Sequence, residues 1–593
     1  MSDHFTFDEY ELYEFPKRYV FLPRERSARA VGTPTRLYSD VLVLDRVTGQ
    51  FKQLDMTGKE GSMFNGADSM TRVFGIVGVI ELVGQRHLIV IVRREYVGSI
   101  FGGHHVYGLR EIKFLPIDPL QPPSRSGISS PEDSKRRDDA YLLMADKVFT
   151  EHDSFYFSYT TNLCVDFQDS NTKNRAPHAA RHFFWNRHLS SALSKSGLSR
   201  YVLPMIRGLI IIEKTVVADS EMTFGLVCRT SNMRAGTRYN CRGADERGNV
   251  ANYCEVEHFI DCNGVFSSFR QIRGSIPFQW TQFAENLKYT PEIKFDNNVR
   301  QHTAVIEQHF QDVFKSYPGP VVAINLCKKK EESQERKLSD MFERLANYSQ
   351  FPQPYVKYIH FDLHHECKGL DFSKLDDLID SLQPQFDEIG YFSIQHKPDP
   401  SATRESKILS LGDDSPSDYS FQPKVLRRQE GIFRVNCVDC CDRTNVAKTY
   451  VSRRVFLQMM FDMNITKRRG NSLLAYPQLE KLFNHMWSEN GDRISSLYTG
   501  TGALMGDYTR TGQRSVRGLM NDGLNSVTRY VKNNFADEIR QRGIHLVLGK
   551  LDLHGTEEQR AFAKANDLLS DVFGANSASS PPNNSSYAHH STY

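Results

Sequence analysis

The feature that most constrains the fold is a series of short apolar runs that alternate with helical segments after residue 320. Four runs are strand candidates: VVAINL at 321–326, YVKYIHFD at 355–362, GYFSIQ at 390–395 and GIFRVN at 431–436. KLSDMFERLAN lies between the first two runs, and SKLDDLIDSL, with an apolar face at helical spacing, follows the second. This alternation predicts an α/β domain with a largely parallel sheet, in which ligands bind where strands end and helices begin.

The stretch 434–446, RVNCVDCCDRTNV, falls at such a junction. It contains the spacing C-x5-R of cysteine-dependent phosphatases, from Cys437 to Arg443. The spacing alone is weak, because the chain contains it three times. The copy ending at Arg247 continues into Gly-Asn, a turn signal, and the copy ending at Arg234 continues into Ala-Gly in a polar stretch. Only Cys437 has a strand candidate before it, and only there does Thr444 follow the arginine, with a helix predicted to start at residue 445.

Phosphatase chemistry explains why those residue types matter. The nucleophile must be a thiolate, and a helix N-terminus with inward-pointing amides lowers the pKa of a thiol. The same amides cradle a phosphate, and an arginine such as Arg443 grips two of its oxygens. A hydroxyl at Thr444 can hydrogen-bond the sulfur when it leaves.

Other interpretations of the cysteines stay open at this point. Cys437, Cys440 and Cys441 could supply zinc ligands, although no second C-x2-C exists and two adjacent cysteines suit a tetrahedral site poorly. Cys437 and Cys440 could also form a redox pair. The simplest interpretation makes Cys440 and Cys441 plain small loop residues.

Composition excludes several classes of protein. A net charge of +3 over 593 residues indicates no nucleic-acid partner. The ten cysteines show no disulfide framework, which suits a reducing compartment. No secretory signal or membrane span is predicted, and the apolar window 73–92 is better explained as a hairpin. Three further segments have a predicted local structure. Residues 119–139 are predicted to be a loop, residues 155–167 a strand, and the polar tail 575–593 is predicted to be disordered.

The motifs resemble those of a known family. The stretch 434–446 resembles the signature R-x-N-C-x-D-C-L-D-R-T-N of Sac-domain phosphoinositide phosphatases of the suppressor-of-actin type. Residues 234–258 (RAGTRYNCRGADERGNVANYCEVEH) and 267–282 (SSFRQIRGSIPFQWTQ) resemble two more of its blocks. With shorter stretches, the resemblance covers roughly residues 10–545. Cys441 replaces the leucine of the signature, and Cys254 and His258 also depart from the family pattern.

The resemblance implies a β-rich N-terminal Sac domain over residues 1–190. An α/β catalytic domain with a central mixed sheet and the C-x5-R loop follows over 191–548. Residues 549–593 form a C-terminal segment with a disordered tail. The implied activity is metal-independent and needs no cofactor. It hydrolyses phosphatidylinositol monophosphates, chiefly phosphatidylinositol 4-phosphate, through a phosphocysteine.

The resemblance also implies roles for the residues of the loop. Cys437 is the nucleophile, Arg443 binds the phosphoryl oxygens, and Thr444 assists the leaving thiolate. The loop amides that bind phosphate include those of Val438, Cys440 and Cys441. Asp439 and Asp442 are the candidates for the general acid, with Asp439 preferred. In the alternative interpretation, both aspartates only fix the shape of the loop.

Many members of the family carry a C-terminal pair of membrane-spanning helices, and none is predicted here. We therefore expect a cytoplasmic enzyme, peripheral on endomembranes of the endoplasmic reticulum or Golgi. Its partners would be phosphoinositide lipids of an anionic membrane surface, and a protein tether is a further candidate. Arg510, Arg514 and Arg517 could dock it there. The same cluster could equally be a solvated face or a loop that packs on the catalytic helix.

Two rival functions use the same fold or loop. One is a non-catalytic adaptor that binds phosphoinositides, which an intact Cys437, Arg443 and Thr444 argue against. The other is a protein tyrosine phosphatase, which the long Sac-like blocks disfavour and which a phosphotyrosine peptide would test.

Overall fold

The computed structural model describes residues 6–24, 40–56, 63–117, 131–172, 177–282, 291–331, 333–349, 351, 356–368, 371–397, 423–467, 473–504 and 537–555. The chain forms two compact units, Met1–Lys550 and Leu551–Tyr593. All sheets and helices named below lie in the first unit.

The N-terminal part begins with a five-stranded antiparallel sheet in the order β4-β3-β2-β1-β5. Its strands are β1 (Tyr10–Phe15), β2 (Arg18–Pro23), β3 (Asp40–Asp45), β4 (Phe51–Asp55) and β5 (Ser69–Val73). Leu12, Phe21 and Leu42 belong to one buried core cluster. Val20, Leu22 and Val41 alternate with such residues along the strands and belong to a second cluster, so the sheet buries apolar side chains on both faces.

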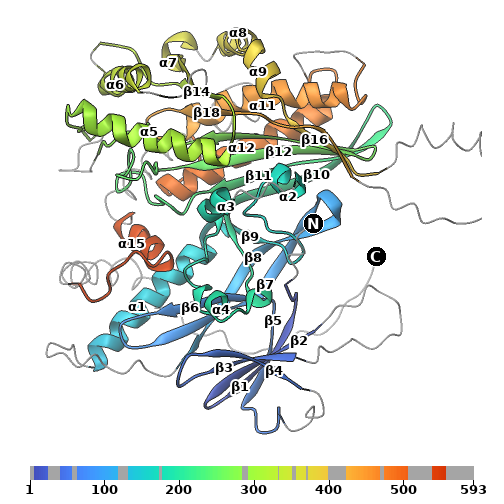
Figure 1. The fold of residues 1–593 in the computed structure, drawn as a ribbon, viewed down its shortest axis with the longest axis vertical. Coiled ribbons are helices and arrows are strands. Elements are labelled where there is room, and N and C mark those ends of the chain that lie inside the picture. The colour runs from blue at the N-terminus through green and yellow to red at the C-terminus, as the bar shows by residue number, and fades with distance from the viewer. Residues whose placement is uncertain are drawn as a thin grey trace, which may run out of the picture. The chain divides into compact units, whose positions relative to one another are not determined.

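Thirteen strands of the described residues form the sheet that carries the rest of the fold. Its strands are β6 (Ile76–Glu81), β7 (Arg86–Ile100), β8 (His104–Pro116), β9 (Phe155–Phe157), β10 (Ile206–Val217), β11 (Ser220–Thr230), β12 (Cys254–Cys262), β13 (Val265–Arg273), β14 (Val321–Asn325), β15 (Val356–His360), β16 (Phe392–Gln395), β17 (Lys424–Arg427) and β18 (Ile432–Asn436). Strands β6 to β12 are labelled in Figure 1. The main path from β6 to β13 is antiparallel, and β13, β18, β14 and β15 are joined by parallel ladders. The predicted central mixed sheet in an α/β protein is confirmed, but only this last portion is parallel.

Helices cover both faces of the parallel portion. Residues of β14 alternate between two cores: Val322 and Ile324 face α8, α9 and α11, whereas Val321 and Ala323 face α5 and α6. The bounds of these helices are α5 (Val299–Ser316), α6 (Gln334–Tyr348), α8 (Ser373–Ser381), α9 (Gln383–Ile389) and α11 (Asp442–Asp462). A strand buried on both faces reads as a continuous apolar run, which explains why VVAINL and GIFRVN were recognisable in the sequence.

The remaining α-helices of the described residues are α1 (Pro131–Thr150), α2 (Phe167–Thr172), α3 (Pro177–Phe183), α4 (Ser191–Lys195), α7 (Leu363–Glu366), α12 (Pro477–Thr499) and α15 (Asp537–Val547). Helix α12 packs against α11 and against strands β10 and β11, and α15 packs against α1. Within the described ranges, no helix is both long enough and apolar enough to cross a membrane.

Several local predictions can be compared with these elements. The hairpin in 73–92 is confirmed by β6 and β7, which pair antiparallel. The loop predicted over 119–139 is wrong from Pro131 onward, because α1 begins there with a proline followed by Glu132 and Asp133, which favour a helix N-terminus. The strand predicted over 155–167 ends at Phe157, and the side chain of Asn162 then closes a turn by accepting the Cys164 amide. The domain boundaries at 190/191 and 548/549 stay predictions.

Candidate active site

The stretch that suggested a phosphatase loop lies between a strand and a helix. Cys437 follows β18 directly, and α11 begins at Asp442, three residues earlier than predicted. Strand β18 lies between β13 and β14 and runs parallel to both. The loop is therefore at the carboxyl edge of the parallel strands, where ligands of such sheets bind.

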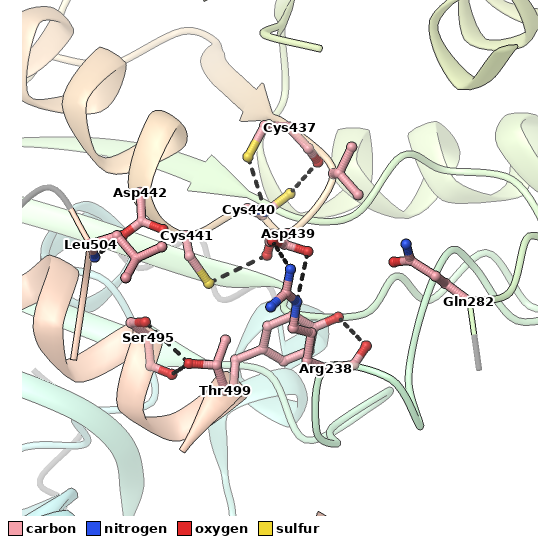
Figure 2. A network of polar contacts seen from close by, with 12 residues as sticks. Arg238, Gln282, Cys437, Asp439, Cys440, Cys441, Asp442, Ser495, Thr499 and Leu504 are labelled. Carbon is pink, nitrogen blue, oxygen red and sulfur yellow. Dashed lines mark hydrogen bonds and ion pairs between the residues drawn. The ribbon is translucent and has the colours of Figure 1, made fainter. Parts of the chain in front are cut away.

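The backbone of the loop is turned so that its carbonyls face outward. Arg242 Nη1 donates to the Val438 carbonyl at 3.2 Å, Asn252 Nδ2 to the Asp439 carbonyl at 2.9 Å, and Arg273 Nη1 to the Cys440 carbonyl at 3.3 Å. The carbonyl and the N–H of one peptide point in opposite directions. The backbone N–H groups of residues 439–441, which share peptides with these carbonyls, therefore point toward the inside of the loop. The Cys440 amide does so and donates to the Cys437 sulfur at 3.2 Å (Figure 2).

This geometry favours an ionised sulfur. The Cys437 side chain is 1% exposed. Hydrogen bonding from the Cys440 side chain lowers the pKa of the Cys437 thiol to about 6, and the Arg443 charge and the Thr444 hydroxyl act in the same direction against burial. Cys440 itself has its pKa raised by burial and by its neighbour Cys437. Thus one sulfur of the stretch, the one predicted to be the nucleophile, is favoured as a thiolate at neutral pH.

Arg443 lies in the first turn of α11 and forms an ion pair with Glu335, which lies in the first turn of α6. The arginine Nη1 donates to Glu335 Oε2 at 2.7 Å, and Nη2 donates to Oε1 at 3.1 Å. Nη1 also donates to the Leu326 carbonyl at 3.3 Å, just beyond β14. Both helices follow neighbouring parallel strands, so their N-termini meet at the same edge of the sheet.

Asp439 is held by two arginines from the segment between β11 and β12. Arg238 donates through Nε and Nη2 at 3.1 and 2.7 Å (Figure 2). Arg242 donates through Nη2 at 2.6 Å. Burial opposes the charge of Asp439, yet these two guanidinium groups hold the pKa of its carboxyl far below the usual range. Arg242 is itself buried and also donates to Gln282 Oε1 at 2.7 Å.

The second aspartate of the loop has a different partner. Asp442 is the first residue of α11, and its Oδ1 accepts the Leu504 amide at 2.6 Å. Thr444, two residues further, is fully buried. The structure therefore brings Cys437, Asp439, Asp442, Arg443 and Thr444 to one strand–helix junction, but each aspartate is engaged with groups that the sequence did not suggest.

The three thiols of the stretch do not point at a common ligand position. Cys440 Sγ contacts the carbonyls of Cys437 and Gly274, both at 3.1 Å. Cys441 Sγ lies 3.5 Å from the Asp439 carbonyl, on another side of the loop (Figure 2). This divergence is unfavourable for the zinc interpretation, since a tetrahedral site requires its sulfurs to converge. In the part of the chain that the structure describes, no cluster of histidine, cysteine, aspartate or glutamate suits a metal ion.

Several residues of the site were missed by the sequence reasoning. Arg238, Arg242 and Asn252 lie in the block 234–258 that resembles the Sac family, so the block was noticed although no role was assigned to them. Glu335 lies in the charged run KKKEESQERK, where nothing distinguishes it from its neighbours. Arg510, Arg514 and Arg517, the predicted membrane-docking residues, lie outside the described residues.

Comparison with known proteins gives the family. A family model described as the SacI homology domain matches residues 74–368. Phosphoinositide phosphatase SAC6 of Arabidopsis thaliana is 31% identical over 549 residues, which cover 91% of this chain and 83% of the relative. The chain belongs to the SacI-homology family of phosphoinositide phosphatases, which are phosphoric monoester hydrolases.

Animal members of the family are similar over the same length. Phosphatidylinositol-3-phosphatase SAC1-A of Danio rerio is 32% identical, with 89% of this chain and 85% of the relative covered. Phosphatidylinositol-3-phosphatase SAC1 of Drosophila melanogaster is 29% identical, with 94% and 84% covered. The resemblance stated from the motifs is thus confirmed for the chain as a whole.

Proposed function

We propose that this member of the SacI-homology family hydrolyses phosphatidylinositol monophosphates, chiefly phosphatidylinositol 4-phosphate, through a phosphocysteine and without a metal ion. The observation that carries the proposal is the position of Cys437. Its sulfur lies at the end of β18, next to the N-terminus of α11, accepts a loop amide, and has a thiol pKa lowered to about 6. A helix N-terminus and a set of loop amides favour the thiolate and the phosphate for the same electrostatic reason.

In the first step, the Cys437 thiolate attacks phosphorus. A sulfur–phosphorus bond forms, the bond from phosphorus to the inositol oxygen breaks, and the departing oxygen takes a proton. The charge that develops on the phosphoryl oxygens is stabilised by the loop amides, among them those of Cys440 and Cys441, and by Arg443.

The proton must come from a carboxyl group that first changes partners. Asp439 is ionised and bound by Arg238 and Arg242, and Asp442 accepts the Leu504 amide. Asp439 becomes a proton donor only when the two arginines release it, for example to the anionic substrate. Asp442 becomes one only when it turns from residue 504 toward the leaving oxygen.

In the second step, water attacks the phosphorus of the phosphocysteine, and the sulfur leaves as a thiolate. The Thr444 hydroxyl and the Cys440 amide both stabilise the ionised sulfur. The loss of inorganic phosphate then returns Cys437 to its starting state, so that no cofactor is consumed.

Membrane docking and location are part of the same proposal. A substrate of this class is embedded in a membrane, so the enzyme must work at an anionic lipid surface. Arg510, Arg514 and Arg517 stay predicted as docking residues, and the cytoplasmic face of the endoplasmic reticulum or Golgi stays the predicted location. A protein tether stays a further candidate.

The test is a panel of all phosphoinositides in vesicles, given to the purified chain and to Cys437→Ser with EDTA present. We expect wild type to release phosphate fastest from phosphatidylinositol 4-phosphate, and Cys437→Ser to release none. Turnover that survives the substitution would remove the proposed nucleophile. No release from any phosphoinositide, with retained binding, would favour the adaptor instead.

A second comparison identifies the acid. Asp439→Asn and Asp442→Asn are assayed on phosphatidylinositol 4-phosphate and on an aryl phosphate whose leaving group needs no proton. The substitution that removes the acid slows only the lipid reaction, whereas one that disturbs the loop slows both.

A further inference from the structure

Glu335 is the only acidic group that the structure pairs with Arg443 among the described residues. It lies 108 positions before that arginine. Its own position is well defined: the Glu335 amide donates to the N-cap hydroxyl of Ser333 at 3.2 Å, and Oε2 also accepts the Lys328 amide at 2.9 Å. The Glu335 and Arg443 side chains are each 19% exposed, so the pair is mostly shielded from water.

The pair uses one particular edge of the guanidinium group. A guanidinium has five N–H donors. Nη1 gives one to Glu335 and one to the Leu326 carbonyl, and Nη2 gives one to Glu335. The two contacts with Glu335 occupy the end of the guanidinium, and the contact with Leu326 uses the Nη1 hydrogen on the side of Cδ. The Nε–H and the second Nη2–H lie side by side on the other edge and take no part in them.

That remaining edge is itself suited to a phosphate. Two parallel N–H groups on one edge of an arginine bind two oxygens of a phosphate or carboxylate bidentately. A carboxylate fixed at the end edge restricts rotation of the guanidinium about its long side chain, which otherwise costs entropy to immobilise.

We propose that Glu335 is a positioning residue that holds Arg443 by its end edge, so that the side edge is presented to the substrate phosphate above Cys437. The inference rests on the proposed phosphatase function and deepens it. Charge supports it: although burial opposes ionisation, Arg443 lowers the pKa of Glu335, so the pair is ionic at neutral pH.

A role in which Glu335 inhibits the enzyme predicts effects opposite to those of a positioning role. If Glu335 instead withheld Arg443 from the substrate, its removal would release the arginine and increase both phosphate affinity and kcat. If it positions the arginine, Glu335→Gln lowers kcat by about 10²-fold, the effect of a small misplacement of a catalytic group. It should also weaken competitive inhibition by inorganic phosphate about tenfold, because one bidentate contact is misaligned.

The decisive experiment is a double-mutant cycle on Glu335→Gln and Arg443→Ala, with inhibition by inorganic phosphate and kcat as readouts. A residue that acts only through Arg443 has no further effect once that arginine is gone. Equal losses in both backgrounds would overturn the proposal, as would unchanged or tighter phosphate binding in Glu335→Gln. Glu335→Asp, which retains the carboxylate, should recover part of the lost kcat.

A matched control lies in the same segment. Glu331→Gln makes the same change of charge at a side chain that is 89% exposed and pairs only with Arg336 in the contacts described. It should leave kcat and phosphate inhibition at wild-type values.

Phosphate binding by calorimetry is also compared in Cys437→Ser with and without Glu335→Gln. This arm needs no turnover. A wild type that is inactive on every phosphoinositide would therefore refute the proposed function, whereas equal phosphate affinities in the two proteins would refute the role of Glu335.

Discussion

The ionisation of Cys437 can be measured directly, and its magnitude follows from the structure. A thiol whose pKa falls from an ordinary 9.0 to about 6 favours its thiolate by about 4 kcal/mol. Since the pKa is lower in the folded state than in the unfolded chain, this stabilisation is complete only above the unfolded value. It is lost as the pH falls through the folded value. Wild type should therefore gain about 3 kcal/mol of unfolding free energy between pH 5.5 and 8.5 that Cys437→Ser does not gain.

Two assays measure this ionisation. The ultraviolet absorbance of the thiolate is titrated in wild type and in Cys437→Ser, and the difference should show a midpoint near pH 6. Denaturant unfolding of both proteins at the two pH values gives the difference in free energy. Cys262→Ser is the control, because burial raises the pKa of that thiol to about 11 and its loss should leave the midpoint unchanged. A midpoint near 9, or parallel stability profiles in wild type and Cys437→Ser, would refute the reasoning.

Three further substitutions test the surroundings of the loop. Asp439→Asn leaves the guanidinium groups of Arg238 and Arg242 without their shared carboxylate and should lower the free energy of unfolding by about 2–3 kcal/mol. The loss is below the range for a fully buried pair because the Asp439 side chain is 22% exposed. Unchanged stability in denaturant unfolding would contradict a stabilising role of these two ion pairs. Thr444→Val should raise the pKa of Cys437 and slow breakdown of the phosphocysteine about 10²-fold. A burst of released inositol lipid should then appear in rapid-quench experiments. The absence of a burst would exclude a role of the Thr444 hydroxyl in the release of the thiolate. Gly491→Ala places a Cβ 2.8 Å from the side-chain nitrogen Nδ2 of Asn445 and should destabilise the fold by about 1–3 kcal/mol in thermal unfolding. A stability equal to that of wild type would show that α11 and α12 can separate at this contact.

The fold was predictable where burial leaves a continuous signal. Strands β14 and β18 are covered on both faces, and their sequences are apolar apart from Asn325, Arg434 and Asn436. The start of α1 was missed because the polar, proline-containing run before Asp139 has the composition of a loop. The strand predicted over 155–167 was too long, because aromatic residues in FYFSYTTNL favour a strand even where side-chain hydrogen bonds close a turn.

Of the candidate site, the sequence identified the residues that are local to one loop. Cys437, Arg443 and Thr444 could be selected because a strand candidate, a spacing and a helix pattern occur within about twenty residues of one another. The cluster of ion pairs around Asp439 could not be derived in this way. Its arginines lie about 200 positions earlier and reach the loop only because β12 and β13 bring the segment between β11 and β12 beside β18.

The contact between Glu335 and Arg443 was only partly predictable from the sequence. Strands β14 and β18 were both predicted, and each is followed by a predicted helix. If two such strands are parallel neighbours, the first turns of their helices must meet at one edge of the sheet. An acid in the first turn after β14 is therefore a candidate partner for an arginine in the first turn after β18. What the sequence lacked was the adjacency of the strands: β18 pairs with β14 although β15, β16 and β17 intervene in the chain. Once that pairing is known, the ion-pair partner of the loop arginine follows from topology, and the side-chain contacts only select Glu335 from the acids of its run.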